Sequence, residues 1–295
     1  PKVLLDLEFQ AFLAEMFAPH CQFVDWSVAM EGSEAERAEI DAVVTHAHPH
    51  VNADFLVRLP NCKVVSNYGV GVDHIVVSDC VAAGIPLGNT PGAVNGATAD
   101  LTMGILLAAA RNIVKGDRYA RSAEFKHVDP GVLLGKDVFG ATLGIVGMGA
   151  IGREVAKRAR GFDMNVIYHN RRRDEAAEGA LDARYVSLDE LLSSSDFVSI
   201  NVPLSAETTG LIGRRELGLM RVDAFFVNAA RGGVVDTDAL YEVLRDGSIA
   251  GAALDVTEPE PLPRDHPLLA QDNVVLLPHL GTSTVDTRKR MAVMA

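Results

Sequence analysis

Leu143-Gly144-Ile145-Val146-Gly147-Met148-Gly149-Ala150-Ile151-Gly152 is the stretch that decides the fold class. An apolar run typical of a buried strand, residues 143–146, leads into a glycine-rich turn, and residues 151–160 continue with the pattern of a helix. The first glycine permits a tight turn, the second lets the backbone approach a pyrophosphate, and the third lets the helix pack on the strand. The helix N-terminus offers N–H groups and its positive dipole end to an anion. This context predicts a dinucleotide site at Gly147, Met148, Gly149, Ala150, Ile151 and Gly152, rather than a simple strand-to-helix turn.

Strand and helix patterns alternate on both sides of this turn. Further strands are expected downstream at 165–168, 197–201, 224–228, 251–255 and 274–277, with helices at 188–193, 214–220 and 237–245. Six strands with intervening helices are typical of a doubly wound dinucleotide-binding domain. Upstream, strands at 3–5, 23–24, 42–45, 64–66 and 85–87 alternate with helical stretches such as 8–17 and 33–39. The alternation predicts a second parallel sheet covered on both faces.

Residues 88–92, Gly-Asn-Thr-Pro-Gly, mark a domain boundary near residue 92, and 295 residues are enough for two domains. One long helix is expected over 97–119, and another begins at 288. The helix over 97–111 is apolar around most of its circumference, which is typical either of a subunit interface or of burial within the chain.

Composition narrows the possible partners. Lys and Arg total 27 and Asp and Glu total 39, so the net charge is −12, which argues against nucleic acid because phosphate binding needs clustered cations. Three widely spaced cysteines favour reduced thiols and a cytoplasmic location over disulfides. No signal-peptide pattern is present, and the longest apolar stretch, 101–110, is about half of what a bilayer crossing takes. We therefore expect no membrane partner. We also expect no metal, since no Cys/His spacing of a metal site occurs.

The strand at 165–168 ends in a basic tip. Folds that bind NAD place an acidic residue about 20 positions after the glycine turn, at the end of the second strand. Here the strand is followed by His169-Asn170-Arg171-Arg172-Arg173, without a carboxylate at the tip. Because arginine can pair with a 2′-phosphate, we expect Asn170, Arg171 and Arg172 to favour NADP(H), with NAD(H) possible. The alternative is a solvated basic loop.

Three other segments follow predicted strands, at the edge where ligands bind in doubly wound sheets. Arg231, among small residues, can grip a carboxylate and a ketone oxygen, or form a structural ion pair. Residues 255–261, Asp-Val-Thr-Glu-Pro-Glu-Pro, can hold a glutamate in one orientation, or form an acidic surface loop. His279 is a candidate acid/base or a structural histidine. Together these segments supply an anion clamp and an oriented proton donor, which the reduction of a 2-oxo acid requires.

The motifs resemble those of the D-isomer-specific 2-hydroxyacid dehydrogenases along nearly the whole chain. The resemblance rests on residues 88–92, 97–102, 147–152, 228–232, 255–261 and 278–281. It implies a flavodoxin-like substrate domain, residues 1–92 and 280–295, into which a Rossmann cofactor domain, residues 93–279, is inserted. It also implies a homodimer to which the apolar helix contributes.

The resemblance further implies site residues. Arg231 would be the substrate clamp, His279 the proton donor and Glu260, rather than Glu258, the partner of that histidine. Backbone N–H groups near Val70 and Gly71 would hold the substrate carboxylate. Cofactor contacts would also come from Val202, Pro203, Thr209, Ala229, Ala230, Arg231, Asp255, His279 and Gly281.

Within the family the chain is most similar to glyoxylate/hydroxypyruvate and 2-ketogluconate reductases, which implies NADPH-dependent reduction of a small 2-oxo acid to the D-2-hydroxy acid. Pro278 stands where formate dehydrogenases of this fold carry a glutamine, which disfavours that activity. A nucleotide-sensing corepressor, or an NAD-dependent dehydrogenase of another substrate, remains an alternative. His46, His48 and His50 follow the third strand and could contact a polar substrate tail, bind a metal or form a solvated loop.

Overall fold

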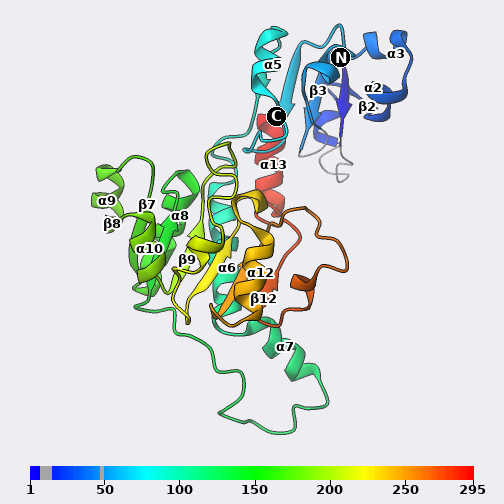
Figure 1. Cartoon of the computed structure of the whole chain (residues 1–295). Coiled ribbons are helices and arrows are strands. Elements are labelled where there is room, and N and C mark those ends of the chain that lie inside the picture. The colour runs from blue at the N-terminus through cyan, green and yellow to red at the C-terminus, as the bar shows by residue number, and fades with distance from the viewer. Residues whose placement is uncertain (7–14, 47–49) are drawn as a thin grey trace. The chain divides into compact units, whose positions relative to one another are not determined.

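The chain forms two compact units in a computed structural model that describes residues 1–6, 15–46 and 50–295. Unit 1 comprises Pro1–Val94 and Thr282–Ala295, and unit 2 comprises Asn95–Gly281. Each unit is built on a parallel sheet, which confirms the expected class of two α/β domains (Figure 1). Most of the expected helix at 8–17, and His48, lie outside the described residues.

The described residues of unit 1 form five strands in the order β2-β1-β3-β4-β5, which is the flavodoxin-like order. Buried valine and leucine side chains from the central strands form its core, for example Leu4, Val43 and Val65. The strands are β1 (Lys2–Leu5), β2 (Gln22–Asp25), β3 (Ala42–Thr45), β4 (Val64–Asn67) and β5 (Leu87–Gly88). The helices are α2 (Ser27–Glu31), α3 (Glu34–Ala38), α4 (Ala53–Leu56), α5 (Val77–Ala82) and α13 (Val285–Met294).

The C-terminal helix α13 belongs to unit 1 although more than 180 residues separate it from the rest of that unit. The hydroxyl of Tyr68 donates a hydrogen bond to the carbonyl of Arg288 at 2.8 Å. The hydroxyl of Ser66 donates to the carbonyl of Ala295 at 3.0 Å. These bonds fasten the helix to the end of β4.

Unit 2 has seven parallel strands in the order β12-β11-β10-β9-β6-β7-β8. In chain order within the unit this is 7-6-5-4-1-2-3, the Rossmann arrangement with one added strand. The strands are β6 (Thr142–Val146), β7 (Asn165–His169), β8 (Ala183–Tyr185), β9 (Phe197–Ile200), β10 (Phe225–Asn228), β11 (Gly251–Leu254) and β12 (Val274–Leu276). The prediction of six strands missed β8, because it has only three residues and exposes Arg184.

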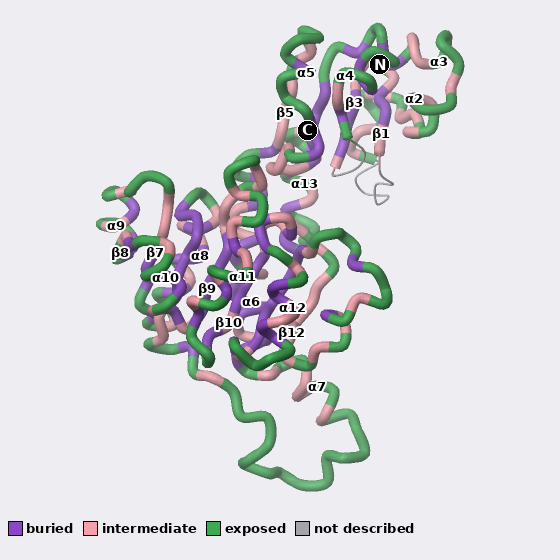
Figure 2. The backbone as a smooth tube through the Cα atoms, in the orientation of Figure 1, coloured by how far each residue is buried: buried purple, intermediate pink, exposed green. Residues whose placement is uncertain are grey.

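Helices lie on both faces of this sheet (Figure 1), namely α6 (Asn95–Ala110), α8 (Ala150–Ala159), α9 (Glu175–Leu181), α10 (Leu188–Ser194), α11 (Arg214–Leu217) and α12 (Thr237–Arg245). Helix α7 (Ile113–Arg121) has no buried residue and projects away from the sheet. Three short 3₁₀ turns, η1 (Arg160–Phe162), η2 (Gly232–Val234) and η3 (Pro267–Ala270), complete the unit. Figure 2 shows that buried residues concentrate in the sheet and in α6, whereas the segment after α7 is exposed.

The expected single helix over 97–119 is wrong. Two helices occupy the region, with a 59° bend between α6 and α7. Asn112 adopts a left-handed conformation, with φ of 51°, which ends the first helix. The N–H of Lys136 caps that helix end by donating to the carbonyl of Ala110 at 2.8 Å. The break therefore combines a left-handed asparagine with a cap from a distant part of the chain.

Helix α6 packs against α8 and the sheet, and it buries Met103, Ile105 and Leu106. Burial within unit 2 therefore explains much of its apolar composition. Among the described residues, no single helix is long and apolar enough to cross a membrane, although α6 and α7 taken together pass that test by length and composition.

Candidate active site

The glycine turn between β6 and α8 has the geometry that the sequence predicts for a pyrophosphate cradle. Gly147 has φ of +102°, and a Cβ there would lie 2.8 Å from the backbone of Asn201. A Cβ on Gly152 would lie 2.2 Å from the carbonyl oxygen of Gly147, so helix and turn pack without room for a side chain. A Cβ on Gly149 would meet nothing within 4 Å. The backbone at Gly149 thus faces open space, at the N-terminus of a helix, as a bound dinucleotide requires.

Asn170 braces this turn. Its side-chain oxygen accepts a hydrogen bond from the N–H of Met148 at 2.7 Å. The carbonyl of His169 accepts one from the N–H of Gly147 at 3.0 Å. The tip of β7 and the glycine turn are therefore held together, as expected for neighbouring parts of one cofactor site.

The three arginines after Asn170 are not equivalent. Arg173 pairs with Glu178 through two hydrogen bonds of 2.8 and 2.7 Å, and this pairing raises the pKa of its guanidinium. Arg171 and Arg172 are exposed, and within the described ranges neither makes a hydrogen bond or an ion pair. These two cations are available to a ligand, whereas the third is occupied by the protein.

His279 and Glu260 form a direct pair. Nδ1 of His279 lies 2.6 Å from Oε1 of Glu260. Burial raises the pKa of Glu260, but the hydrogen bond to His279 and the charges of His279 and Arg231 outweigh it, so this pKa is lowered overall. An ionised Glu260 accepts the Nδ1 proton, which leaves Nε2 as the ring nitrogen directed to other partners.

Arg231 is brought to this pair by a close backbone approach. A Cβ on Gly232 would lie 2.0 Å from the carbonyl group of Thr257, so only glycine lets the segment after β10 touch the loop after β11. Asn228 fixes the same segment by donating to the carbonyl of Arg231 at 2.9 Å. The asparagine that ends β10 is a positioning residue that sequence reasoning did not single out.

Asp255 orients the turn that carries His279. Its side chain is 1% exposed, and its two oxygens accept the N–H groups of Leu280 and Gly281 at 2.6 and 2.8 Å. Burial raises the pKa of this carboxyl, although the two N–H groups partly oppose the shift. His279 itself has φ of 57°, in the left-handed region. The turn is thus held in an uncommon conformation by a buried carboxylate.

The remaining cofactor candidates lie on two neighbouring loops. Val202 and Pro203 follow β9, and the side chain of Val202 borders Gly147. The hydroxyl of Thr209 donates to the carbonyl of Ser205 at 2.8 Å, which stabilises the same loop. Ala229 and Ala230 follow β10 and are half-buried. Like the other site residues, these remain predictions.

In unit 1, Val70 and Gly71 lie on the loop after β4. His46 follows β3, where its Nε2 lies 3.1 Å from Nη1 of Arg288 and its ring lies 5.6 Å from that of Tyr68. His50 is exposed. Among residues 1–6, 15–46 and 50–295, no group of three His, Cys, Asp or Glu side chains could hold a metal ion.

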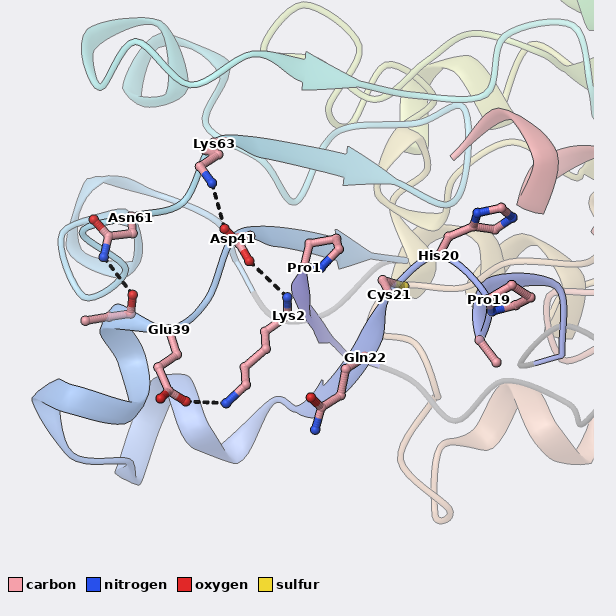
Figure 3. Close-up of a pocket in the computed structure, with 12 residues that line it drawn as sticks. Pro1, Lys2, Pro19, His20, Cys21, Gln22, Glu39, Asp41, Asn61 and Lys63 are labelled. Carbon is pink, nitrogen blue, oxygen red and sulfur yellow. Dashed lines mark hydrogen bonds and ion pairs between the residues drawn. The ribbon is translucent and has the colours of Figure 1, made fainter.

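A separate hollow of about 880 Å³ lies at the opposite, amino-terminal edge of the unit 1 sheet. Figure 3 shows its charged residues, in which Lys2 pairs with Glu39 and Lys63 pairs with Asp41. Its charges are satisfied within the protein, and no site residue predicted from the sequence lies there.

A model of the NAD binding domain of D-isomer specific 2-hydroxyacid dehydrogenases matches residues 103–281. The chain belongs to this family. It is an NAD(P)-dependent oxidoreductase, as the resemblance implied.

Three relatives illustrate the match. A glyoxylate reductase of Korarchaeum cryptofilum is 46% identical over 257 residues, 87% of this chain and 77% of that protein. The NADPH-dependent glyoxylate/hydroxypyruvate reductase of Sinorhizobium meliloti, solved with NADP and malonate, has a TM-score of 0.90 at 28% identity, covering 99% of this chain and 90% of that one. The D-lactate dehydrogenase of Aquifex aeolicus, solved with NAD and lactic acid, has a TM-score of 0.88 at 25% identity, covering 99% and 92%.

Proposed function

We propose that the protein is an NADPH-dependent reductase that converts a small 2-oxo acid, of the glyoxylate, hydroxypyruvate or 2-ketogluconate type, to the D-2-hydroxy acid. The 2.6 Å contact between His279 and Glu260, in the same unit as the glycine turn, is the observation that carries the proposal. The similarity to glyoxylate reductases of archaea and bacteria supports the substrate class.

His279, Glu260 and Arg231 have separate roles in the proposed reaction. When bound, NADPH supplies a hydride to the carbonyl carbon, and the resulting alkoxide oxygen takes one proton from Nε2 of His279. Glu260 holds the ring so that Nε2 faces the substrate, and it balances the positive charge of the protonated ring. Arg231 binds the substrate and stabilises the negative charge that develops on its oxygen. The products are the D-2-hydroxy acid and NADP⁺.

The preference for NADPH over NADH rests on the unequal arginines. Arg171 and Arg172 are exposed and, within the described part of the chain, make no hydrogen bond or ion pair, although the charge of Arg171 lowers the pKa of Glu207. They directly follow Asn170, whose side chain is bonded to the glycine turn. We assign the 2′-phosphate to these two residues. Each charge-assisted bond to a phosphate contributes about 1.5–3 kcal/mol, which corresponds to tenfold or more in affinity.

The test is the loss of reduced-nicotinamide absorbance with glyoxylate, hydroxypyruvate, phenylpyruvate and 2-ketogluconate, each with NADPH and with NADH. We expect turnover with one of these acids and a lower KM for NADPH than for NADH. Arg171→Ala and Arg172→Ala should raise the KM for NADPH at least tenfold and leave that for NADH unchanged. Arg173→Ala, the matched control, should change neither. Tight cofactor binding without turnover of any acid would refute the reductase in favour of a nucleotide-sensing role.

We further propose a homodimer, formed through α7 and the segment that follows it. Val128, Leu134 and Phe139 on that segment are 84%, 76% and 69% exposed, and apolar side chains gathered on one extended segment are typical of an interface. Sedimentation should give a mass of twice 31.5 kDa. Leu134→Glu should shift the protein to the monomer, and a monomeric wild type would refute the interface.

A further inference from the structure

Two asparagine side chains donate hydrogen bonds to three consecutive backbone carbonyls in the loop that follows β4. Nδ2 of Asn67 donates to the carbonyls of Gly69 and Gly71 at 2.9 and 2.8 Å. Nδ2 of Asn89 donates to the intervening carbonyl of Val70 at 3.0 Å. Asn67 is 1% exposed, so its carboxamide is fixed by the core of unit 1.

These bonds dictate where the N–H groups of the loop point. In a planar trans peptide the carbonyl of one residue and the N–H of the next point in opposite directions. Because the three carbonyls face the asparagines, the N–H groups of Val70, Gly71 and Val72 face away from them. None of these three N–H groups donates a hydrogen bond within the described part of the chain. Successive unpaired N–H groups form a concave site for an anion.

The loop needs these hydrogen bonds to keep its backbone in one conformation. Glycine readily changes its backbone conformation, so the peptides around Gly69 and Gly71 can rotate at little steric cost. A rotated peptide would present a carbonyl oxygen to the anion in place of an N–H group. The N–H of Thr90 adds a further bond to the carbonyl of Gly69 at 3.0 Å. The hydrogen bonds from Asn67, Asn89 and Thr90, here called the brace, therefore hold every carbonyl of residues 69–71.

We propose that Asn67 and Asn89 are positioning residues that set the substrate-carboxylate site, and that the N–H of Val72 is its third donor beside those of Val70 and Gly71. The inference rests on the proposed function for the identity of the anion, a 2-oxo acid carboxylate. Neither asparagine touches the substrate. They act by keeping the three carbonyl groups pointed away from the anion, so that the three N–H groups point toward it.

The test compares three variants in the full-length protein. Asn67→Ala and Asn89→Ala remove the brace. Asn61→Ala is the matched control, because its carboxamide also donates to one backbone carbonyl of unit 1, that of Ala38 at 2.7 Å, at the opposite edge of the sheet (Figure 3). Steady-state kinetics with glyoxylate and NADPH are measured together with calorimetric titration of oxalate, a two-carbon carboxylate probe that undergoes no reduction.

We expect Asn89→Ala to raise the KM for glyoxylate and the Kd of oxalate about tenfold, and Asn67→Ala to raise both further, since it releases two carbonyls. The KM for NADPH should stay unchanged, which a general loss of structure would not produce. Should Asn67→Ala fail to fold, the half-buried Asn89 carries the test. Values for Asn89→Ala within twofold of those for Asn61→Ala would overturn the proposal. Oxalate binding that depends on the brace, without turnover of any 2-oxo acid, would refute the proposed function and leave the anion site standing.

Discussion

Replacing Glu260 by glutamine should show how much the negative charge of Glu260, as opposed to the geometry of its side chain, contributes to the action of the His279–Glu260 pair. Glutamine keeps the length of the side chain and an oxygen that can accept the Nδ1 proton, but it removes the negative charge. The structure provides a control in the same Glu-Pro-Glu-Pro loop, because Glu258 has the same flanking prolines and, within the described residues, makes no hydrogen bond or ion pair with His279.

The size of the effect follows from the contact. At 2.6 Å the bond is as short as charge-assisted hydrogen bonds in proteins become, and such bonds contribute about 1.5–3 kcal/mol, roughly twice the value of neutral ones. Removing only the charge should therefore cost about 1–1.5 kcal/mol, or about tenfold in kcat. Removing the whole bond, in Glu260→Ala, should cost about 10- to 150-fold.

The assay is NADPH oxidation with the preferred 2-oxo acid at saturating concentrations of both substrates. We expect the order wild type, Glu260→Gln and Glu260→Ala in falling kcat, with Glu258→Gln equal to the wild type and cofactor affinity equal in all four. If Glu258→Gln lowers kcat as much as Glu260→Gln, the loop acts through its total charge, and the pairing of one glutamate with His279 is the wrong explanation.

Three further expectations concern other parts of the molecule. His279→Asn should lower kcat about 10²–10⁴-fold at saturating NADPH, with saturation checked by titration of cofactor fluorescence; a smaller loss would exclude a proton donor. Gly152→Ala should weaken NADPH binding at least about tenfold in the same titration, since the added Cβ lies 2.2 Å from a backbone oxygen of the cradle, and unchanged binding would refute the cradle. Lys136→Met should lower the free energy of unfolding by about 1–3 kcal/mol near neutral pH, because Lys136 lies 2.8 Å from Asp196 and both side chains are largely buried. Burial raises the pKa of Asp196, but Lys136 lowers it overall, so this stabilisation is complete above the ordinary aspartate range and is lost as pH falls through the lowered pKa. Urea unfolding should therefore show a smaller acid-induced loss in the variant than in the wild type, and equal losses would contradict the assignment.

The sequence predicted strands best where the apolar run was continuous. β6 and β9 lie within a residue of their expected bounds because their side chains are buried on both faces of the sheet. The break between α6 and α7 was missed, because its local signal is the single Asn112, a weaker helix-ending residue than glycine or proline, and the cap comes from the distant Lys136. Local patterns carry no information on such a contact.

The same distinction between local patterns and contacts with distant residues applies to the predicted site. The glycine turn and the pairing of His279 with a glutamate depend on residues whose spacing is visible in the chain. The difference between Arg173 and its two neighbours was not visible, because Glu178 lies on α9, a helix that the pattern did not predict. Asp255 was expected to contact the cofactor, whereas both of its oxygens hold backbone N–H groups of the His279 turn. Its contact with the cofactor stays a prediction.

The left-handed backbone at His279 restricts which amino acids evolution or a protein engineer can place there. Besides glycine, this region of conformational space is enriched in asparagine, aspartate and histidine, and β-branched or bulky side chains are strongly disfavoured. Among these four residues, only histidine exchanges protons near neutral pH while carrying a second nitrogen for an orienting partner. The turn that Asp255 holds thus favours histidine among the residues that exchange protons, because a lysine or tyrosine acid at this position would adopt the left-handed backbone at a higher cost in free energy.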